Sequence, residues 1–182
     1  APKDPAKLQE IANMMLRERS DIIVGIEFVG PDSGANFARE YLRDEYRAIR
    51  IPATSPSEMR EITFFVRRDL PLHFEVESHA NLRWNDPAAR GRSKRLFSRD
   101  LPGLLLRARE GDKPFMVVIG THGKAMRDRY GDPRSRLLRE AQLRAYVDLI
   151  RSYEQRFGEN LAVLLSGDFN TNLEAGNEAG II

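Results

Sequence analysis

The chain has 182 residues, of which 41% are hydrophobic and 31% charged, with a formal net charge of +2 and no cysteine. This length predicts a single domain over residues 1–182 with a sizeable core, and the lack of cysteine excludes disulfides and thiolate metal sites. No apolar stretch approaches the roughly 20 residues of a membrane-spanning helix, so the sequence predicts a soluble protein, cytoplasmic or exported, whose oligomeric state stays open.

Hydrophobic periodicity predicts a chain in which helices and strands alternate. In the first half, we expect helices over residues 5–19 and 33–43, and strands over residues 21–28, 46–51, 62–67 and 72–76. In the second half, we expect a polar, Arg-rich loop over 81–94, a hairpin of strands 104–109 and 115–120, a helix over 134–156 and a strand over 161–165. The fold class is therefore mixed α/β, and the two strands that flank the long helix should be parallel.

Polar residues follow three of the apolar strands at their carboxyl ends. The first strand runs into Glu27, the strand over 115–120 runs into Thr121 to Lys124, and the last strand runs into residues 166–172 (Ser-Gly-Asp-Phe-Asn-Thr-Asn). The carboxyl ends of parallel strands are where ligand sites form in α/β sheets. We therefore expect a carboxylate, an imidazole and an Asp-x-Asn pair to meet at one edge.

Each of these residues has a functional and a structural interpretation. Glu27, inside the apolar run Ile-Glu-Phe-Val, would be costly to bury unless a hard cation such as Mg²⁺ or an Arg side chain paired with it. Asp168 could activate a water while Asn170 donates to a phosphate oxygen, although both residues also favour an Asx-turn. His122 could be a general acid or a hydrogen-bonded residue at the end of a strand.

Taken together, the motifs resemble those of the endonuclease/exonuclease/phosphatase superfamily, which includes exonuclease III and deoxyribonuclease I. The resemblance rests on Asp-Ile-Ile-Val-Gly-Ile-Glu at 21–27, Gly-Thr-His-Gly-Lys at 120–124 and Ser-Gly-Asp-Phe-Asn at 166–170, in this order and spacing. The Gly-Asp-Phe-Asn block is the most specific piece, and Arg139-x-x-Gln142 also fits. Nearly all of the chain is covered.

The resemblance implies a four-layer α/β/β/α sandwich with mixed sheets and Mg²⁺- or Mn²⁺-dependent hydrolysis of a phosphate ester. Glu27 would be the metal ligand, Asp168 would position or activate the attacking water, and Asn170 would hold the scissile phosphate. His122 would help to protonate the leaving group, with Glu61 as its paired carboxylate. The candidate substrate-binding residues are Arg99, Lys124 and Asn172.

The same resemblance implies further segments that have no counterpart here. The family opens with a strand that carries an Asn near the metal, and it closes with strands that carry a second Asp or Asn and a histidine. Because no such segments match, we expect the chain to be an incomplete domain of this family. A catalytically silent binding or scaffold domain of the same fold is therefore the rival hypothesis.

Basic residues near the expected site bear on the substrate. Arg makes up 24 of the 29 basic residues, which suits phosphate ligands, although high genomic GC content produces the same bias. Two basic clusters flank the site, Arg83 to Arg99 and Lys124 to Arg139, and Trp84 in the first could stack on a base. DNA or RNA is the leading substrate; solvated loops, or a phosphatase- or sphingomyelinase-like phosphoesterase, are the alternatives.

Overall fold

The computed structural model of the chain describes residues 4–52, 60–87, 90 and 92–170. Its helices are α1 (Pro5–Glu18), α2 (Ser33–Tyr41) and α3 (Arg136–Phe157), the last preceded by a 3-10 turn, η2 (Pro133–Ser135). Its strands are β1 (Ile22–Val29), β2 (Tyr46–Ile51), β3 (Arg60–Arg67), β4 (His73–Glu77), β5 (Arg83–Asp86), β6 (Arg92–Arg95), β7 (Gly103–Arg107), β8 (Met116–His122) and β9 (Ala162–Asp168). Within these ranges, no helix is long and apolar enough to cross a membrane.

The strands form two sheets and a ribbon. One sheet has the order β1-β3-β2 and is antiparallel, the second has the order β4-β7-β8-β9, and β5 pairs with β6 in a separate two-stranded ribbon. In the second sheet only β8 and β9 are parallel, with α3 between them in the chain. The predicted parallel pair and the predicted hairpin, β7 with β8, are both confirmed.

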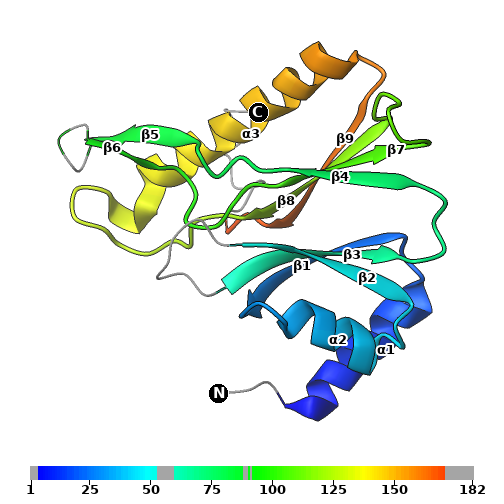
Figure 1. Cartoon of the computed structure of the whole chain (residues 1–182). Coiled ribbons are helices and arrows are strands. Elements are labelled where there is room, and N and C mark those ends of the chain that lie inside the picture. Colours follow the sequence, from blue (N-terminus) through cyan, green and yellow to red (C-terminus); the bar gives the residue numbers. More distant parts are fainter. Residues whose placement is uncertain (1–3, 53–59, 88–89, 91, 171–182) are drawn as a thin grey trace.

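The molecule has four layers (Figure 1), as the resemblance implied. Helices α1 and α2 cover one face of the β1-β3-β2 sheet, the other face packs on the β4-β7-β8-β9 sheet, and α3 covers the far side of that second sheet. Three apolar clusters fill the three interfaces between these layers. The fold class is therefore a mixed α/β sandwich, as the sequence predicts.

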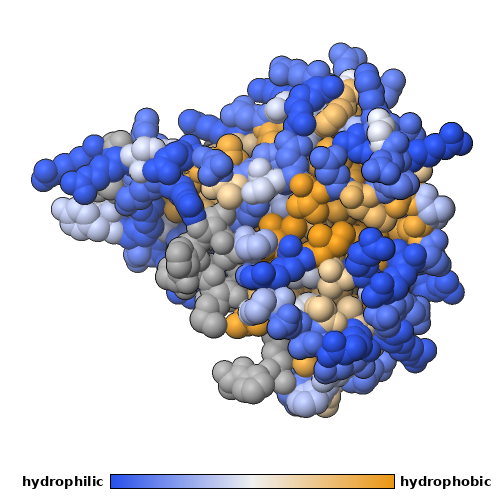
Figure 2. Space-filling model, viewed as in Figure 1, coloured by the Kyte–Doolittle hydropathy of each residue, from blue (hydrophilic) through white to orange (hydrophobic). Residues whose placement is uncertain are grey.

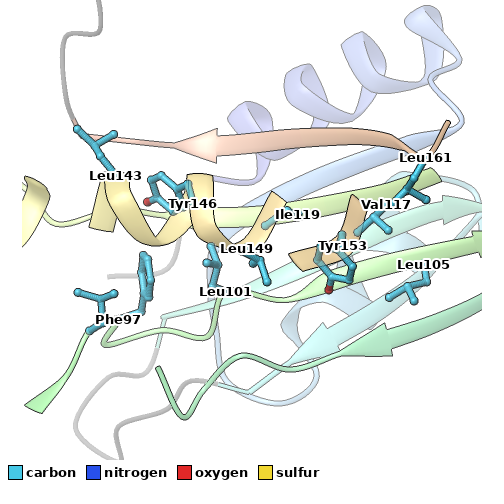
Figure 3. Packing of buried hydrophobic residues seen from close by; sticks show 11 residues of the cluster. Phe97, Leu101, Leu105, Val117, Ile119, Leu143, Tyr146, Leu149, Tyr153 and Leu161 are labelled. Carbon is cyan, nitrogen blue, oxygen red and sulfur yellow. The ribbon is translucent and has the colours of Figure 1, made fainter. Parts of the chain in front are cut away.

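The alternation of side chains along each strand explains why the sandwich has apolar surfaces on both sides of its sheets. In β3, Phe64 faces the second sheet, whereas Phe65 packs against α1 and α2. In β7, Leu104 belongs to the core between the sheets, whereas Leu105 belongs to the cluster beneath α3 shown in Figure 3. Because successive side chains point to opposite faces, a strand buried on both sides needs a continuous apolar run.

One predicted element is wrong. The sequence predicts a loop over residues 81–94, but half of these residues belong to the ribbon of β5 and β6. These strands carry mostly polar residues, and Trp84, which packs against the cluster beneath α3, is their partly buried apolar side chain. Without an apolar face, the strand pattern is invisible to hydrophobic periodicity.

Candidate active site

The carboxyl ends of β8 and β9 are held together by backbone pairing. In the parallel register His122 lies beside Asp168, and Thr121 lies beside Gly167. Gly167 has φ 138, and a Cβ at this position would overlap the carbonyl oxygen of Thr121. A Cβ on Gly123 would likewise overlap the carbonyl oxygen of Phe169. Two glycines therefore let the two strand ends approach more closely than side chains would permit.

Asp168 and Asn170 form a compact turn directly after β9. The backbone N–H of Asn170 donates to Asp168 Oδ1 at 2.8 Å, and its side-chain amide donates to Asp168 Oδ2 at 3.0 Å and to the carbonyl of Gly123 at 3.1 Å. Asn170 adopts φ 50, a left-handed conformation that Asn tolerates better than most residues. The Asx-turn considered for this pair is thus present, and it brings the carboxylate and the amide into contact.

Glu27 reaches the same place from the other sheet. The pairing of β1 with β3 shifts between Gly25 and Phe28, and Glu27 in this bulge has φ 64. Its Oε1 lies 3.8 Å from His122 Nε2. Bulges re-aim side chains, and a non-glycine residue at positive φ stores strain that often accompanies function. The Glu27 side chain is 42% exposed, so the costly burial expected from the sequence is absent.

Glu61 does not pair with His122 as the resemblance implied. Both of its carboxylate oxygens accept hydrogen bonds from the guanidinium of Arg50, at 2.5 and 2.7 Å. These bonds raise the pKa of Arg50. The alternation of β3 explains the difference, because Ile62 and Phe64 face the second sheet. Glu61 therefore projects to the opposite face, together with the next odd-numbered residues of the strand.

The structure describes two of the three predicted substrate-binding residues, Arg99 and Lys124. Arg99 is buried, and the backbone N–H of Lys124 donates to Gln142 Oε1 at 2.9 Å. Gln142 also donates to the carbonyl of Leu96 at 2.9 Å, so one buried amide joins the segment after His122 to the segment before Arg99. Asn172 lies outside the described residues.

Tyr146 is a supporting residue that sequence analysis missed. Its hydroxyl lies 2.8 Å from Thr121 Oγ1, and its ring packs edge-on against Phe169 at 5.8 Å. Burial raises the pKa of Tyr146 to about 12, assisted by the charge of Asp168 and opposed by the hydrogen bond with Thr121. Tyr146 stands one helical turn after Gln142, so the shared face of α3 was the available signal.

We name Glu27, His122, Asp168 and Asn170 the strand-end cluster. Among the described residues no group of three or more His, Asp or Glu could hold a metal ion. The exposed carboxylate of Glu27 nevertheless suits Mg²⁺, which binds through one or two carboxylates and keeps several waters. The cluster thus offers one hard ligand for a divalent ion beside an imidazole and a carboxylate–amide pair.

Comparison with known proteins shows that this chain resembles solved structures in its fold. No protein-family model and no curated protein matches the chain. Truncated TDP2 of Caenorhabditis elegans superposes with a TM-score of 0.63 and 16% identity over 93% of this chain and 57% of that chain. A second structure of TDP2 from C. elegans gives a TM-score of 0.61 and 16% identity over 93% of this chain and 44% of that chain.

ANGEL2, described as a 2′,3′-cyclic phosphatase and solved with adenosine-2′,3′-vanadate, gives a TM-score of 0.61 and 18% identity over 94% of this chain and 46% of that chain. The present chain therefore spans between 44% and 57% of the length of these proteins. TDP2 and ANGEL2 are members of the endonuclease/exonuclease/phosphatase superfamily. The layers, the sheet order and these superpositions agree: the chain has the deoxyribonuclease I-like fold of that superfamily.

Proposed function

We propose that the chain is a metal-dependent hydrolase of phosphate esters, with a preference for diesters, that acts at the strand-end cluster. The observation that carries this proposal is the meeting of Glu27, His122 and Asp168, which come from strands of both sheets. A metal-binding carboxylate, an imidazole acid and a carboxylate base are the groups that phosphate-ester hydrolysis requires. ANGEL2, which shares the fold, acts on a 2′,3′-cyclic phosphate, which is chemically a diester.

In this proposal the turn after β9 activates the attacking water and binds the phosphate. Asp168 accepts a proton from the water, and Asn170 donates to an oxygen of the phosphate. Both donors of the Asn170 amide are already engaged, with Asp168 and with Gly123. Substrate binding therefore exchanges the bond between Asn170 and Asp168 for one to phosphate, which also frees Asp168 Oδ2 to accept from water.

Other residues of the cluster and its surroundings protonate the leaving group and stabilise the negative charge of the phosphate. His122 donates a proton to the departing oxygen, and Lys124 and Arg99 contact the phosphate, as does Asn172. Glu27 would hold Mg²⁺ or Mn²⁺, which when bound polarises the phosphate and stabilises charge on the leaving oxygen. Glu61 has no part in this arrangement, because Arg50 occupies its carboxylate.

Hydrolysis of bis(p-nitrophenyl) phosphate tests the proposal. With Mg²⁺ or Mn²⁺ we expect turnover that EDTA abolishes, and Glu27→Gln and Asp168→Asn should each reduce the rate by about 100-fold or more, since each removes a charge used in the reaction. Asp148→Asn, the same change at an exposed position of α3, is the matched control and should keep the wild-type rate.

Several outcomes would contradict the proposal. Near-wild-type turnover in Asp168→Asn would remove the strand-end cluster from the reaction. Faster cleavage of the p-nitrophenyl monoester than of the diester would make the chain a phosphatase instead. Absence of turnover with both substrates, in a folded protein supplied with metal, would favour the catalytically silent binding domain.

A further inference from the structure

Two basic segments lie outside the strand-end cluster, and Lys124 is the one residue of these segments that has a part in the proposed chemistry. Residues 83–95 and 124–136 together contain ten Lys or Arg and three Asp, a net charge of +7, whereas the whole chain is +2. All other residues therefore sum to −5. So uneven a distribution focuses a positive field on one part of the surface.

A buried ion network joins these two segments into one body. Arg129 donates to Asp86 at 2.7 Å and to Asp132 at 3.2 Å, and Lys94 donates to Asp86 at 2.8 Å. The carboxylates of both Asp residues are fully buried. The hydrogen bonds from Lys94 and Arg129 hold the pKa of Asp86 below its usual range. The β5–β6 ribbon is thereby fixed against the segment that precedes α3.

The ribbon exposes several cations, of which Arg83 donates hydrogen bonds to Ser93 on the opposite strand. In the pairing of β5 with β6, Arg83 lies directly opposite Arg95, and like charges in this position are destabilising. Arg92 and Arg95 are exposed, and in the part of the chain that the structure describes no ion pair involves either of them. Figure 2 shows the ribbon as a hydrophilic projection from the body.

An exposed aromatic side chain accompanies these charges. Tyr130 is 96% exposed and occupies the tip of a two-residue turn, which backbone hydrogen bonds of 3.2 and 3.0 Å between Arg129 and Asp132 close. The Arg129 side chain anchors this turn to the ribbon through Asp86. A ring held in solvent on an anchored turn adds nothing to the core, but both of its faces are available for stacking.

Trp84 is not available in the same way. Its ring packs against the cluster beneath α3, and the Arg129 guanidinium lies over it at 5.9 Å from the ring centre. The stacking role that the sequence suggested for Trp84 therefore falls to Tyr130.

The basic surface is connected to the strand-end cluster. Leu96, directly after β6, is bonded through Gln142 to Lys124, two residues after His122. Figure 1 shows the ribbon on the side of the molecule where β8 and β9 end. A ligand lying along the ribbon and the Tyr130 turn can thus continue to the candidate active site.

We propose that the β5–β6 ribbon and the Tyr130 turn bind a single strand of nucleic acid whose scissile bond lies at the strand-end cluster; the second half of this statement rests on the proposed function. Arg side chains of the ribbon contact phosphates, and Tyr130 stacks on a base. Single strands combine these two needs, since a duplex keeps its base faces covered. An anionic membrane offers the charge but no ring to stack on.

Binding of a fluorescently labelled oligonucleotide of about 12 nucleotides, followed by anisotropy in EDTA, tests this surface. Arg92→Ala with Arg95→Ala should weaken binding and flatten the plot of log affinity against log salt by about 1.4, at roughly 0.7 per lost phosphate contact. Tyr130→Ala should weaken binding about tenfold, whereas Tyr130→Phe should keep the wild-type affinity. Arg17→Ala with Arg39→Ala removes the same charge from exposed positions of α1 and α2, and it should leave binding unchanged.

Three results would overturn the proposal: an equal loss in the Arg17 and Arg39 control, an unchanged affinity in Tyr130→Ala, or binding to phosphatidylserine vesicles without binding to the oligonucleotide. Because EDTA removes any hydrolysis, this measurement does not depend on the proposed activity. Oligonucleotide binding without cleavage of bis(p-nitrophenyl) phosphate would retain the surface and reject the activity. Cleavage of bis(p-nitrophenyl) phosphate without binding of the oligonucleotide would retain the activity and reject the binding surface.

Discussion

The strand-end cluster and the ion network beneath the ribbon are positioned by different forces. The cluster is placed by the backbone, through the register of β8 with β9, the bulge in β1 and two glycines. The ribbon is placed by buried charges, with Arg129 shared between Asp86 and Asp132. Backbone placement is insensitive to salt and pH, whereas charge placement depends on ionisation. The two regions should therefore fail under different conditions.

The largest expected effect is the loss of backbone placement in Gly167→Ala. The added methyl group would overlap the carbonyl of Thr121, and the residue would also have to keep φ 138. We expect a destabilisation of about 4 kcal/mol or more, because neither Thr121 nor residue 167 can move without breaking the β8–β9 pairing. Urea unfolding measures it, with Ser166→Ala on the same strand as the control. A Gly167→Ala protein of wild-type stability would show that the strand ends need not touch.

Removal of the buried charge should have an intermediate effect. Asp86→Asn keeps the shape of the side chain, but it removes the carboxylate that Lys94 contacts and leaves Arg129 with the carboxylate of Asp132. We expect a loss of about 2–3 kcal/mol, below the usual cost of breaking a buried pair because Lys94 is 48% exposed. Trp84 is the only tryptophan and lies under Arg129, so its fluorescence reports the ribbon directly.

The Asp86→Asn variant should also differ from the wild type in how its Trp84 fluorescence changes at low pH. Because the pKa of Asp86 is lowered in the folded protein, its contribution to stability is complete above the unfolded value of about 3.9 and disappears as the pH falls through the folded value. The wild-type Trp84 signal should therefore change in acid, and Asp86→Asn should lack that change. An identical acid transition in both proteins would mean that other carboxylates hold the ribbon.

The smallest expected effect is that of Tyr146→Phe, which removes the hydrogen bond to Thr121 next to the cluster. A loss of about 1 kcal/mol is typical of one such bond. With a pKa of about 12, the neutral hydroxyl stabilises the fold fully below pH of about 10, and this contribution is lost as the pH rises through 12. Urea midpoints at neutral and alkaline pH should converge for wild type and Tyr146→Phe. A constant gap would contradict this role.

Much of the fold could be predicted because the strands are buried on both faces. Strands such as β3, β7 and β8 contain continuous apolar runs, and their order brings the polar residues at their ends together. All predicted helices and strands agree with the structure to within three residues at each end. The cluster could be predicted from this placement, since His122 and Asp168 lie within three residues of the ends of predicted strands.

The parts that could not be predicted depend on side-chain direction and on polar partners. Which face Glu61 uses depends on the register of β3, and Arg50 could be identified as its partner only after β2 was aligned beside it. The ribbon has no apolar face, so its structural role depends on the partly buried Trp84 and the buried Asp86. Tyr130 is conspicuous only through its exposure, which a sequence does not record.

The separation of the cluster residues along the chain bears on the time at which the cluster forms. His122 pairs with Asp168, and Glu27 meets His122 from the other sheet, so the cluster closes two long loops of chain. Loops of this length are closed late in folding, after local helices and hairpins have formed. During synthesis the ribosome must release Asp168 before β9 can pair with β8. A nascent chain therefore cannot assemble the strand-end cluster before Asp168 has left the ribosome.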